Sequence, residues 1–268
     1  MRVFDTLGKR KTVLGMVHLP PLPGTPFYEE GSFGRTLDAA VASARALAEG
    51  GADGCLVQTV DRAYATGEES DPARTAAATL IVHAIATATG DGFQIGVQLM
   101  VNALKASLAV AKVAGGSYIR AGVLVGATLT PHGMVEAHPL EVMDYRARIG
   151  AQQIKVIAEV ESMHFRWLGE ARPVGQVARY AQNVGADAVS LGHPDEDTTL
   201  RMIDAVREAV PGLPVILAGY TNHGNAARLL AAADGAYVGT CLERDGWGGQ
   251  IDPERVRAYM DIVRSLEG

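Results

Sequence analysis

The sequence predicts a single (β/α)8 barrel, and three observations support this fold. Short apolar runs alternate strictly with helical stretches along 268 residues, with eight of each. A glycine or a Gly-Ala-Asp-like turn precedes five of the apolar runs, as expected where a helix ends and a parallel strand begins. No linker or change in composition divides the chain, so we predict one domain over residues 1–268. An open doubly wound sheet is the alternative, but no early G-x-G-x-x-G motif supports it.

The first expected strand, residues 12–18, runs into a loop at residues 19–24 that is too rich in proline to continue a strand or a helix. The first helix, residues 35–49, carries apolar residues at helical spacing and stops at two glycines. The other strands are expected at residues 55–58, 93–98, 118–120, 154–161, 188–191, 215–218 and 235–238. The other helices are expected at residues 72–88, 102–114, 139–149, 173–184, 196–210, 225–232 and 253–266. No element is assigned to residues 122–138.

The composition and charge of the chain limit the kinds of partner that it is expected to bind. The net charge of −6 makes a nucleic-acid backbone an unfavourable main partner. The first residues lack the apolar region of a signal peptide, and no apolar run approaches the ~20 residues needed to span a bilayer. We therefore expect a cytoplasmic protein that binds neither nucleic acid nor membranes. Because barrels often associate, we also expect a homo-oligomer.

Active sites of such barrels form at the C-terminal ends of the strands, and this rule selects the candidate residues. The candidates for substrate binding on the second to fourth strands are Gln58, Gln98, Asn102 and Arg120. Arg120 ends an apolar strand, where its guanidinium would pair with Glu159 or with an oxyanion of a substrate.

The fifth strand carries the strongest chemical signal. Glu159 and Glu161 are two residues apart, so both are expected on one face of the strand. Two carboxylates at the end of an apolar strand are costly to bury unless they are paired or used. They could act as a general base or hold a metal ion, and the structural alternative is an ion pair with Arg120 or Lys155.

Two histidines complete the catalytic candidates. His18 ends the first strand and would serve as a general acid, a general base or a metal ligand, or brace the proline loop. His193 follows the sixth strand and is either a ligand or a loop brace, while Asp195 is expected to cap the next helix. His18, Glu161 and His193 together would make a mononuclear divalent-metal site, the one cofactor considered, although no close-spaced metal motif supports it.

The turns after the seventh and eighth strands are the best candidates for binding a phosphate. Both strands end in glycine, whose bare backbone lets an oxyanion approach closely, and barrels commonly hold phosphate at this position. The residues expected to bind it are Gly219, Tyr220, Thr221, Asn222, Gly239 and Thr240. The alternative is that the glycines only make the turns.

Four stretches resemble the BtpA/SgcQ family: LGMVHLPPLPGTPFY at residues 14–28, VGATLTPHGMVEAHPLEVMDYRARIGA at 125–151, ADGAYVGTCLERDG at 233–246 and the closing IDPERVRAYM. The family is named for a protein linked to photosystem I biogenesis. The resemblance implies a barrel related to phosphate-binding barrels and does not imply a reaction. Several strand ends differ from the family pattern, among them AEVESMHF on the fifth strand, so the chain is identified as a divergent member.

Three functions follow as hypotheses. The first is an enzyme acting on a phosphorylated small molecule, such as a sugar phosphate or nucleotide derivative, by general acid–base chemistry of the isomerase, lyase or glycosyl-transfer type. Glu161 would be its base, and His18 or His193 its acid. The second is a non-catalytic assembly or stability factor, as the family name suggests. The third is a metal-dependent hydrolase or epimerase.

Overall fold

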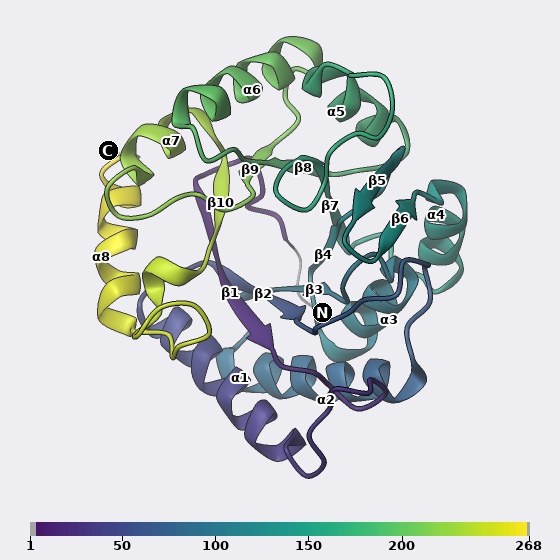
Figure 1. The fold of residues 1–268 in the computed structure, drawn as a ribbon. Helices are drawn as coiled ribbons and strands as arrows, with labels where there is room; N and C mark the ends of the chain where they lie inside the picture. Colours follow the sequence, from purple (N-terminus) through teal and green to yellow (C-terminus); the bar gives the residue numbers. More distant parts are fainter. Residues whose placement is uncertain (1–3, 267–268) are drawn as a thin grey trace.

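The computed structural model describes residues 4–266. The barrel strands are β1 (Thr12–Leu19), β2 (Gly54–Thr59), β3 (Gln94–Gln98), β4 (Tyr118–Ala121), β7 (Lys155–Glu161), β8 (Ala188–Leu191), β9 (Val215–Leu217) and β10 (Gly235–Val238). They are parallel and close in chain order into a barrel, which confirms the predicted fold and rules out the open sheet (Figure 1). Within residues 4–266, no helix combines the length and the apolar composition that crossing a bilayer requires.

Helices surround the barrel, one after each barrel strand (Figure 1). They are α1 (Phe33–Glu49), α2 (Pro72–Thr89), α3 (Leu104–Ala114), α4 (Pro139–Arg148), α5 (Val174–Asn183), α6 (Glu196–Ala209), α7 (Ala226–Ala232) and α8 (Pro253–Arg264). A 3-10 turn, η1 (Thr240–Leu242), follows β10. Predicted and observed bounds differ by no more than two residues, because apolar periodicity and glycine turns both mark the same boundaries.

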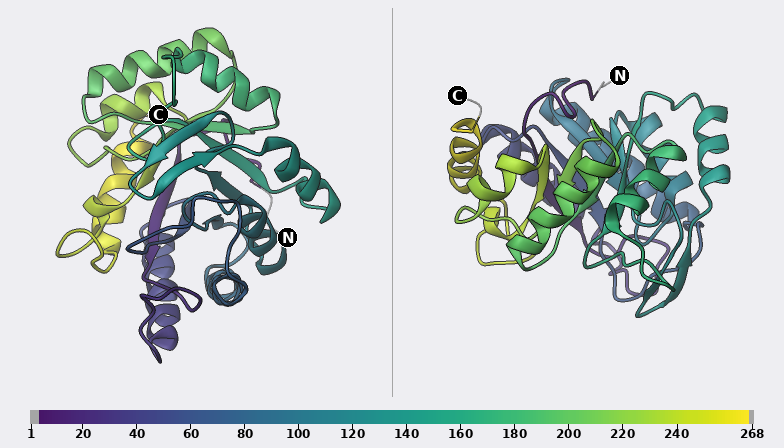
Figure 2. Two further views of the ribbon diagram at one scale, coloured as in Figure 1. Left: turned by 45° about the vertical axis from the view of Figure 1, so that its right-hand side comes forward. Right: turned by 90° about the horizontal axis from the view of Figure 1, so that it is seen from above.

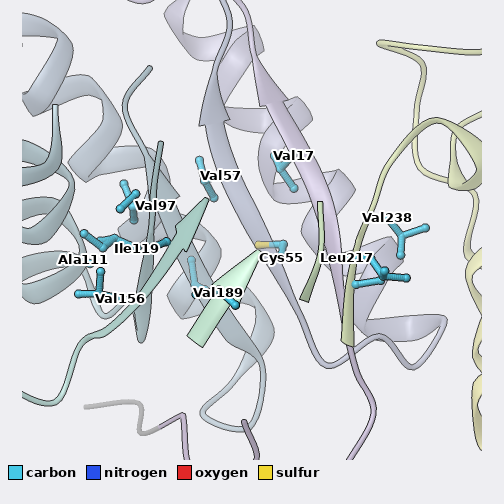
Figure 3. Packing of buried hydrophobic residues seen from close by; sticks show 14 of the residues in the cluster. Val17, Cys55, Val57, Val97, Ala111, Ile119, Val156, Val189, Leu217 and Val238 are labelled. Carbon is cyan, nitrogen blue, oxygen red and sulfur yellow. The ribbon is translucent and has the colours of Figure 1, made fainter. Parts of the chain in front are cut away.

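Side chains of the barrel strands alternate between two buried layers. One set packs between the strands and the helices, and Figure 3 labels Val17, Val57 and Val97 among its members. The other set fills the barrel itself with Leu14, Met16, Leu56, Tyr118, Ile157, Ala188, Ile216 and Tyr237, together with Phe4. The interior is therefore a packed core, and any polar side chain that points inward must lie above or within it.

The recurring Gly-Ala-Asp turns have a structural function beyond reversing the chain. Asp53, Asp187 and Asp234 each accept a hydrogen bond from a backbone N–H of the preceding strand, at 2.7, 2.9 and 2.7 Å. An arginine pairs with each of these carboxylates. Because the three turns lie at the N-terminal ends of the strands, this pattern stabilises the barrel at the end opposite to the expected site.

A β-hairpin that the sequence did not predict lies between β4 and α4. Its strands are β5 (Ala127–Thr130) and β6 (Gly133–Glu136), and it projects from the end of the barrel where the strands terminate (Figure 2). Its backbone bonds to the segment after β7, where the Leu168 N–H donates to the Ala127 carbonyl at 2.9 Å. Its short, half-exposed strands carry little apolar periodicity, which explains why the pattern missed them.

Candidate active site

A ring of polar side chains closes the apolar interior at the C-terminal end of the barrel. In six strands, an apolar residue or a glycine that faces the barrel interior is followed, two positions later, by a polar residue on the same face. These polar residues are His18, Gln58, Gln98, Arg120, Glu159 and Ser190. We call these six residues the polar ring. Five of them are almost fully buried, and His18 is the exception with 17% of its side chain exposed. The strand-end rule therefore brings five of the predicted site residues together.

The two glutamines of the ring bind each other. Gln58 donates from Nε2 to Gln98 Oε1 at 3.1 Å. Asn102, the other amide candidate, is used differently: its side chain exchanges two hydrogen bonds with the backbone of Val123, at 2.9 and 2.8 Å. Asn102 thus braces the chain after β4, and both ends of its amide are engaged.

Arg120 and Glu159 form a buried ion pair, which the sequence suggested as one of two alternatives. Arg120 Nη2 lies 2.6 Å from Glu159 Oε1, and the side chains are 4% and 0% exposed. The Ser162 hydroxyl donates to the same carboxylate oxygen, and the Arg120 guanidinium lies 4.9 Å from the centroid of the Tyr237 ring. A buried pair of this kind has a high desolvation cost, so it is weak evidence of a purely stabilising role.

Several buried polar atoms around this pair lack a hydrogen-bond partner among the residues described. They are Arg120 Nε, Glu159 Oε2, Ser190 Oγ and the Tyr237 hydroxyl. Buried polar atoms are nearly always hydrogen-bonded, so each of these four calls for a partner such as a water molecule or a bound ligand. Burial also raises the pKa of Tyr237, so its hydroxyl stays protonated at neutral pH.

Removing the hydroxyl group from each of the two buried tyrosines of the barrel is expected to have opposite effects on stability. Tyr237→Phe removes an unpaired hydroxyl and should leave the free energy of unfolding unchanged or raise it by about 1 kcal/mol. Tyr118→Phe removes a hydroxyl that donates to the Cys55 carbonyl at 2.8 Å, and should lower it by about 1 kcal/mol. Urea unfolding of the two variants measures the difference. Equal losses would show that the Tyr237 hydroxyl has a partner in solution.

Glu161 occupies a different environment from Glu159. A β-bulge between the two residues shifts the register against β8 and breaks the simple alternation that the sequence predicted. Glu161 is therefore half-buried at the rim, with the Arg166 Nε 4.0 Å from its Oε1. Partial burial raises the pKa of Glu161, and the nearby charges of Arg166 and His193 oppose that shift.

His164, also beyond β7, faces the same end of the barrel, although the sequence did not select it as a catalyst. Desolvation by the surrounding protein lowers the pKa of His164, and the carboxylate of Glu159 opposes that effect. Its side chain keeps an exposed surface. A lowered pKa keeps the imidazole neutral at physiological pH.

His18 lies beside a cavity of about 890 Å³. The cavity is bounded by the proline loop after β1, by α1 and by the loop after β10. Glu243, which the sequence did not suggest, lies in this wall with its Oε1 3.8 Å from His18 Nδ1. The Trp247 ring lies 5.6 Å from the imidazole and is 64% exposed. The cavity has the size of a small-molecule site and contains a titratable side chain from the polar ring.

His193 is held as a loop brace. Its Nδ1 accepts the Asp195 N–H at 3.0 Å, and its backbone N–H donates to the Thr199 hydroxyl at 3.1 Å. Asp195 accepts the Thr198 N–H at 2.8 Å, which confirms the predicted helix cap. Nε2 is the ring nitrogen of His193 that these bonds leave available.

The polar side chains of the turn after β9 form hydrogen bonds within the protein. Thr221 shares a 2.6 Å hydrogen bond with the Tyr259 hydroxyl, and Asn222 Oδ1 accepts the Gly224 N–H at 2.8 Å. Gly219 and Tyr220 both have positive φ, +103° and +58°, which shapes the turn. Thr221 therefore faces the core of the barrel wall and not an open site.

The turn after β10 lies close to His18. A side-chain carbon added at Gly239 would stand 3.9 Å from His18 Cε1 and 3.4 Å from Met16 Cγ, so the bare backbone of this turn borders the polar ring. Thr240 begins η1 with an exposed side chain, and no side chain caps that turn. Of the two predicted phosphate turns, this one borders the polar ring and presents an exposed threonine, whereas Thr221 of the other turn is bonded to Tyr259.

Within residues 4–266, no three His, Cys, Asp or Glu side chains are grouped so that they could hold a metal ion. The structure therefore does not assemble His18, Glu161 and His193 into the metal site that the sequence suggested as an alternative.

Comparison with known proteins identifies the family. The family model described as "BtpA family" matches residues 9–265. The chain belongs to the BtpA family. It is 30% identical to the photosystem I biogenesis protein BtpA of Synechocystis, covering 98% of this chain and 91% of that protein. It is 25% identical to the putative sgc region protein SgcQ of Escherichia coli, covering 98% and 97%.

Solved structures that resemble this BtpA family member share its fold at low sequence identity. Tryptophan synthase from Mycobacterium tuberculosis superposes with a TM-score of 0.60 and 17% identity, over 97% of this chain and 93% of that one. Orotidine 5′-phosphate decarboxylase from Pyrococcus horikoshii superposes with a TM-score of 0.58 and 14% identity, over 94% and 99%. These matches establish the barrel fold and carry no function by themselves.

Proposed function

We propose that this protein is an enzyme that acts on a phosphorylated small molecule by general acid–base catalysis. The reaction would be of the isomerase, lyase or glycosyl-transfer type. The observation that carries the proposal is the polar ring, because an apolar side chain at each of its positions would fill the barrel mouth at lower cost in free energy. The buried Arg120–Glu159 pair and the polar atoms around it supply charged and hydrogen-bonding groups that a polar ligand could contact.

Glu161 and His18 are the proposed base and acid. The raised pKa of Glu161 brings its carboxyl closer to the range in which a general base is effective at neutral pH. His18 borders the 890 Å³ cavity. His193 already uses Nδ1 to hold its own loop, so we favour His18 as the acid.

The turn after β10 is the proposed phosphate site. Gly239 has no side chain to obstruct an oxyanion, and Thr240 adds an exposed hydroxyl. Because Gly239 borders His18, a phosphate there would lie beside the proposed acid. The similarity to a barrel named orotidine 5′-phosphate decarboxylase supports a phosphorylated ligand, since such barrels commonly hold phosphate after their last two strands.

A role in assembly is the second candidate, because one relative is named a photosystem I biogenesis protein. In that case the polar ring would serve no turnover. Substitutions within it would then change stability alone, and this difference separates the two candidates.

Glu161→Gln tests the proposed base through the pH dependence of the reaction. Glu161 must be deprotonated to act, and its raised pKa places the loss of activity on acidification at a higher pH than for an ordinary glutamate. The variant should lose that acidic limb and about 10²–10⁴-fold in kcat/KM. Glu254→Gln, in an exposed ion pair on α8, is the matched control and should retain the wild-type profile. An unchanged acidic limb in Glu161→Gln would contradict the assignment.

A further inference from the structure

We infer that Glu243 is a positioning residue that fixes His18 as an acid–base group, by accepting the Nδ1–H of the imidazole and leaving Nε2 for the substrate. The inference rests on the catalytic role proposed for His18. Glu243 lies five residues beyond the end of β10, so it belongs to none of the strand ends that supply the polar ring.

The first argument is the state of the two side chains. His18 Nδ1 is buried and has no hydrogen-bond partner among the residues described, and Glu243 Oε1 lies 3.8 Å from it. The Glu243 side chain is 3% exposed. Hydrogen bonds between catalytic groups are often long in free enzymes and shorten when the substrate binds. A small rotation of the imidazole would close this one.

The second argument is that Glu243 is held rigidly. Its other carboxylate oxygen accepts the Gly248 N–H at 2.8 Å, and its backbone N–H donates to the Thr240 carbonyl at 3.2 Å. Its backbone also pairs with Ile251 in an isolated antiparallel bridge, and Arg255 donates to its carbonyl oxygen. These contacts fix the direction in which the carboxylate points. An orienting carboxylate needs this rigidity, because it must hold one ring geometry through the reaction.

The third argument is charge. Within residues 4–266, His18 is the one basic side chain found within 4.0 Å of the Glu243 carboxylate. Burying a carboxylate that has no cationic partner costs free energy, so a hydrogen bond from the His18 Nδ1–H to the oxygen that faces it would stabilise Glu243. The other charged groups near His18 are Glu29, Arg35, Asp61 and Arg62, which line the same cavity, and His164 across the mouth. None of these forms an ion pair or hydrogen bond with His18 in the described structure.

Trp247 also lies beside the imidazole. Its ring lies 5.6 Å from the imidazole, tilted by 44°, and it belongs to the same loop as Glu243 and Gly248. The loop after β10 therefore supplies both the acceptor for Nδ1 and an aromatic wall for the ring.

Histidine tautomers measured by NMR test the inference without a substrate. Protein labelled with ¹⁵N-histidine is compared with His18→Gln, which identifies the signals of His18. We expect neutral His18 to carry its proton on Nδ1 in the wild type. In Glu243→Met, which has no carboxylate, the Nε2–H tautomer should become populated. Glu243→Gln retains an acceptor oxygen and should restore the Nδ1–H tautomer at least in part. Glu29→Gln, at the exposed rim of the same cavity, is the control and should match the wild type.

The outcomes separate this inference from the proposed function. An Nε2–H tautomer in the wild type, or an unchanged tautomer in Glu243→Met, would overturn the role of Glu243. If Glu243→Met does not fold, the wild-type tautomer alone decides. Once a substrate is known, Glu243→Met should lower kcat by about tenfold or more with little change in KM. Full turnover in His18→Gln would contradict the proposed function instead, whatever tautomer His18 adopts.

Discussion

Arg120→Met is expected to lower the free energy of unfolding by about 3–5 kcal/mol. The substitution leaves the Glu159 carboxylate, which is fully buried, without its cation. Among residues 4–266, only the Ser162 hydroxyl would still form a hydrogen bond with it. It also removes the guanidinium from the face of the Tyr237 ring. Urea denaturation at neutral pH measures the loss. Arg257→Met breaks the exposed ion pairs of Arg257 with Glu254 and Glu49 and, as the control, should unfold at nearly the same urea concentration as the wild type.

The double variant Arg120→Met/Glu159→Leu separates charge from packing. Removing both charges should restore most of the stability that Arg120→Met loses, because no buried charge remains unpaired. A similar loss in the double and the single variant would show that the ion pair contributes mainly by filling space. The double variant should nevertheless lose activity, since the proposed function requires the polar ring.

His18→Gln is expected to lower kcat by about 10²–10⁴-fold, the usual contribution of a general acid or base. Glutamine fills similar space but cannot exchange a proton at neutral pH, so the fold should be retained. The measurement is steady-state turnover of the compound that the wild-type protein converts. His83→Gln, on the exposed face of α2, is the matched control and should turn over normally. Equal rates in the two variants would exclude His18 as the acid.

The fold could be predicted because local and global signals agree. Apolar periodicity located all eight barrel strands, and the Gly-Ala-Asp turns marked where they begin. The additional role of Asp53, Asp187 and Asp234 in binding the neighbouring strand could not be predicted, because it depends on which strands are adjacent. The hairpin β5–β6 was missed since its strands are short and half-exposed.

The site could be predicted only in part. The strand-end rule found the polar ring because alternation decides which residues point inward. It could not foresee that Asn102 binds the backbone of Val123 or that the Thr221 hydroxyl is bonded to the Tyr259 hydroxyl. Glu243 was not predicted because it follows a 3-10 turn and lies beyond the strand end. Only the folded loop directs its side chain toward His18. Tyr237 resembled an ordinary core residue, since its unpaired hydroxyl becomes evident only in three dimensions.

Turnover of matched phosphorylated and unphosphorylated compounds tests the central claim most directly. Wild-type protein and His18→Gln are each incubated with pairs such as a sugar phosphate and its free sugar, or a nucleotide and its nucleoside, and the products are followed by mass spectrometry. The account predicts that the wild type converts at least one phosphorylated compound, that its unphosphorylated partner reacts far more slowly, and that His18→Gln converts neither. Conversion of both partners at equal rates, or equal conversion by the wild type and His18→Gln, would contradict it.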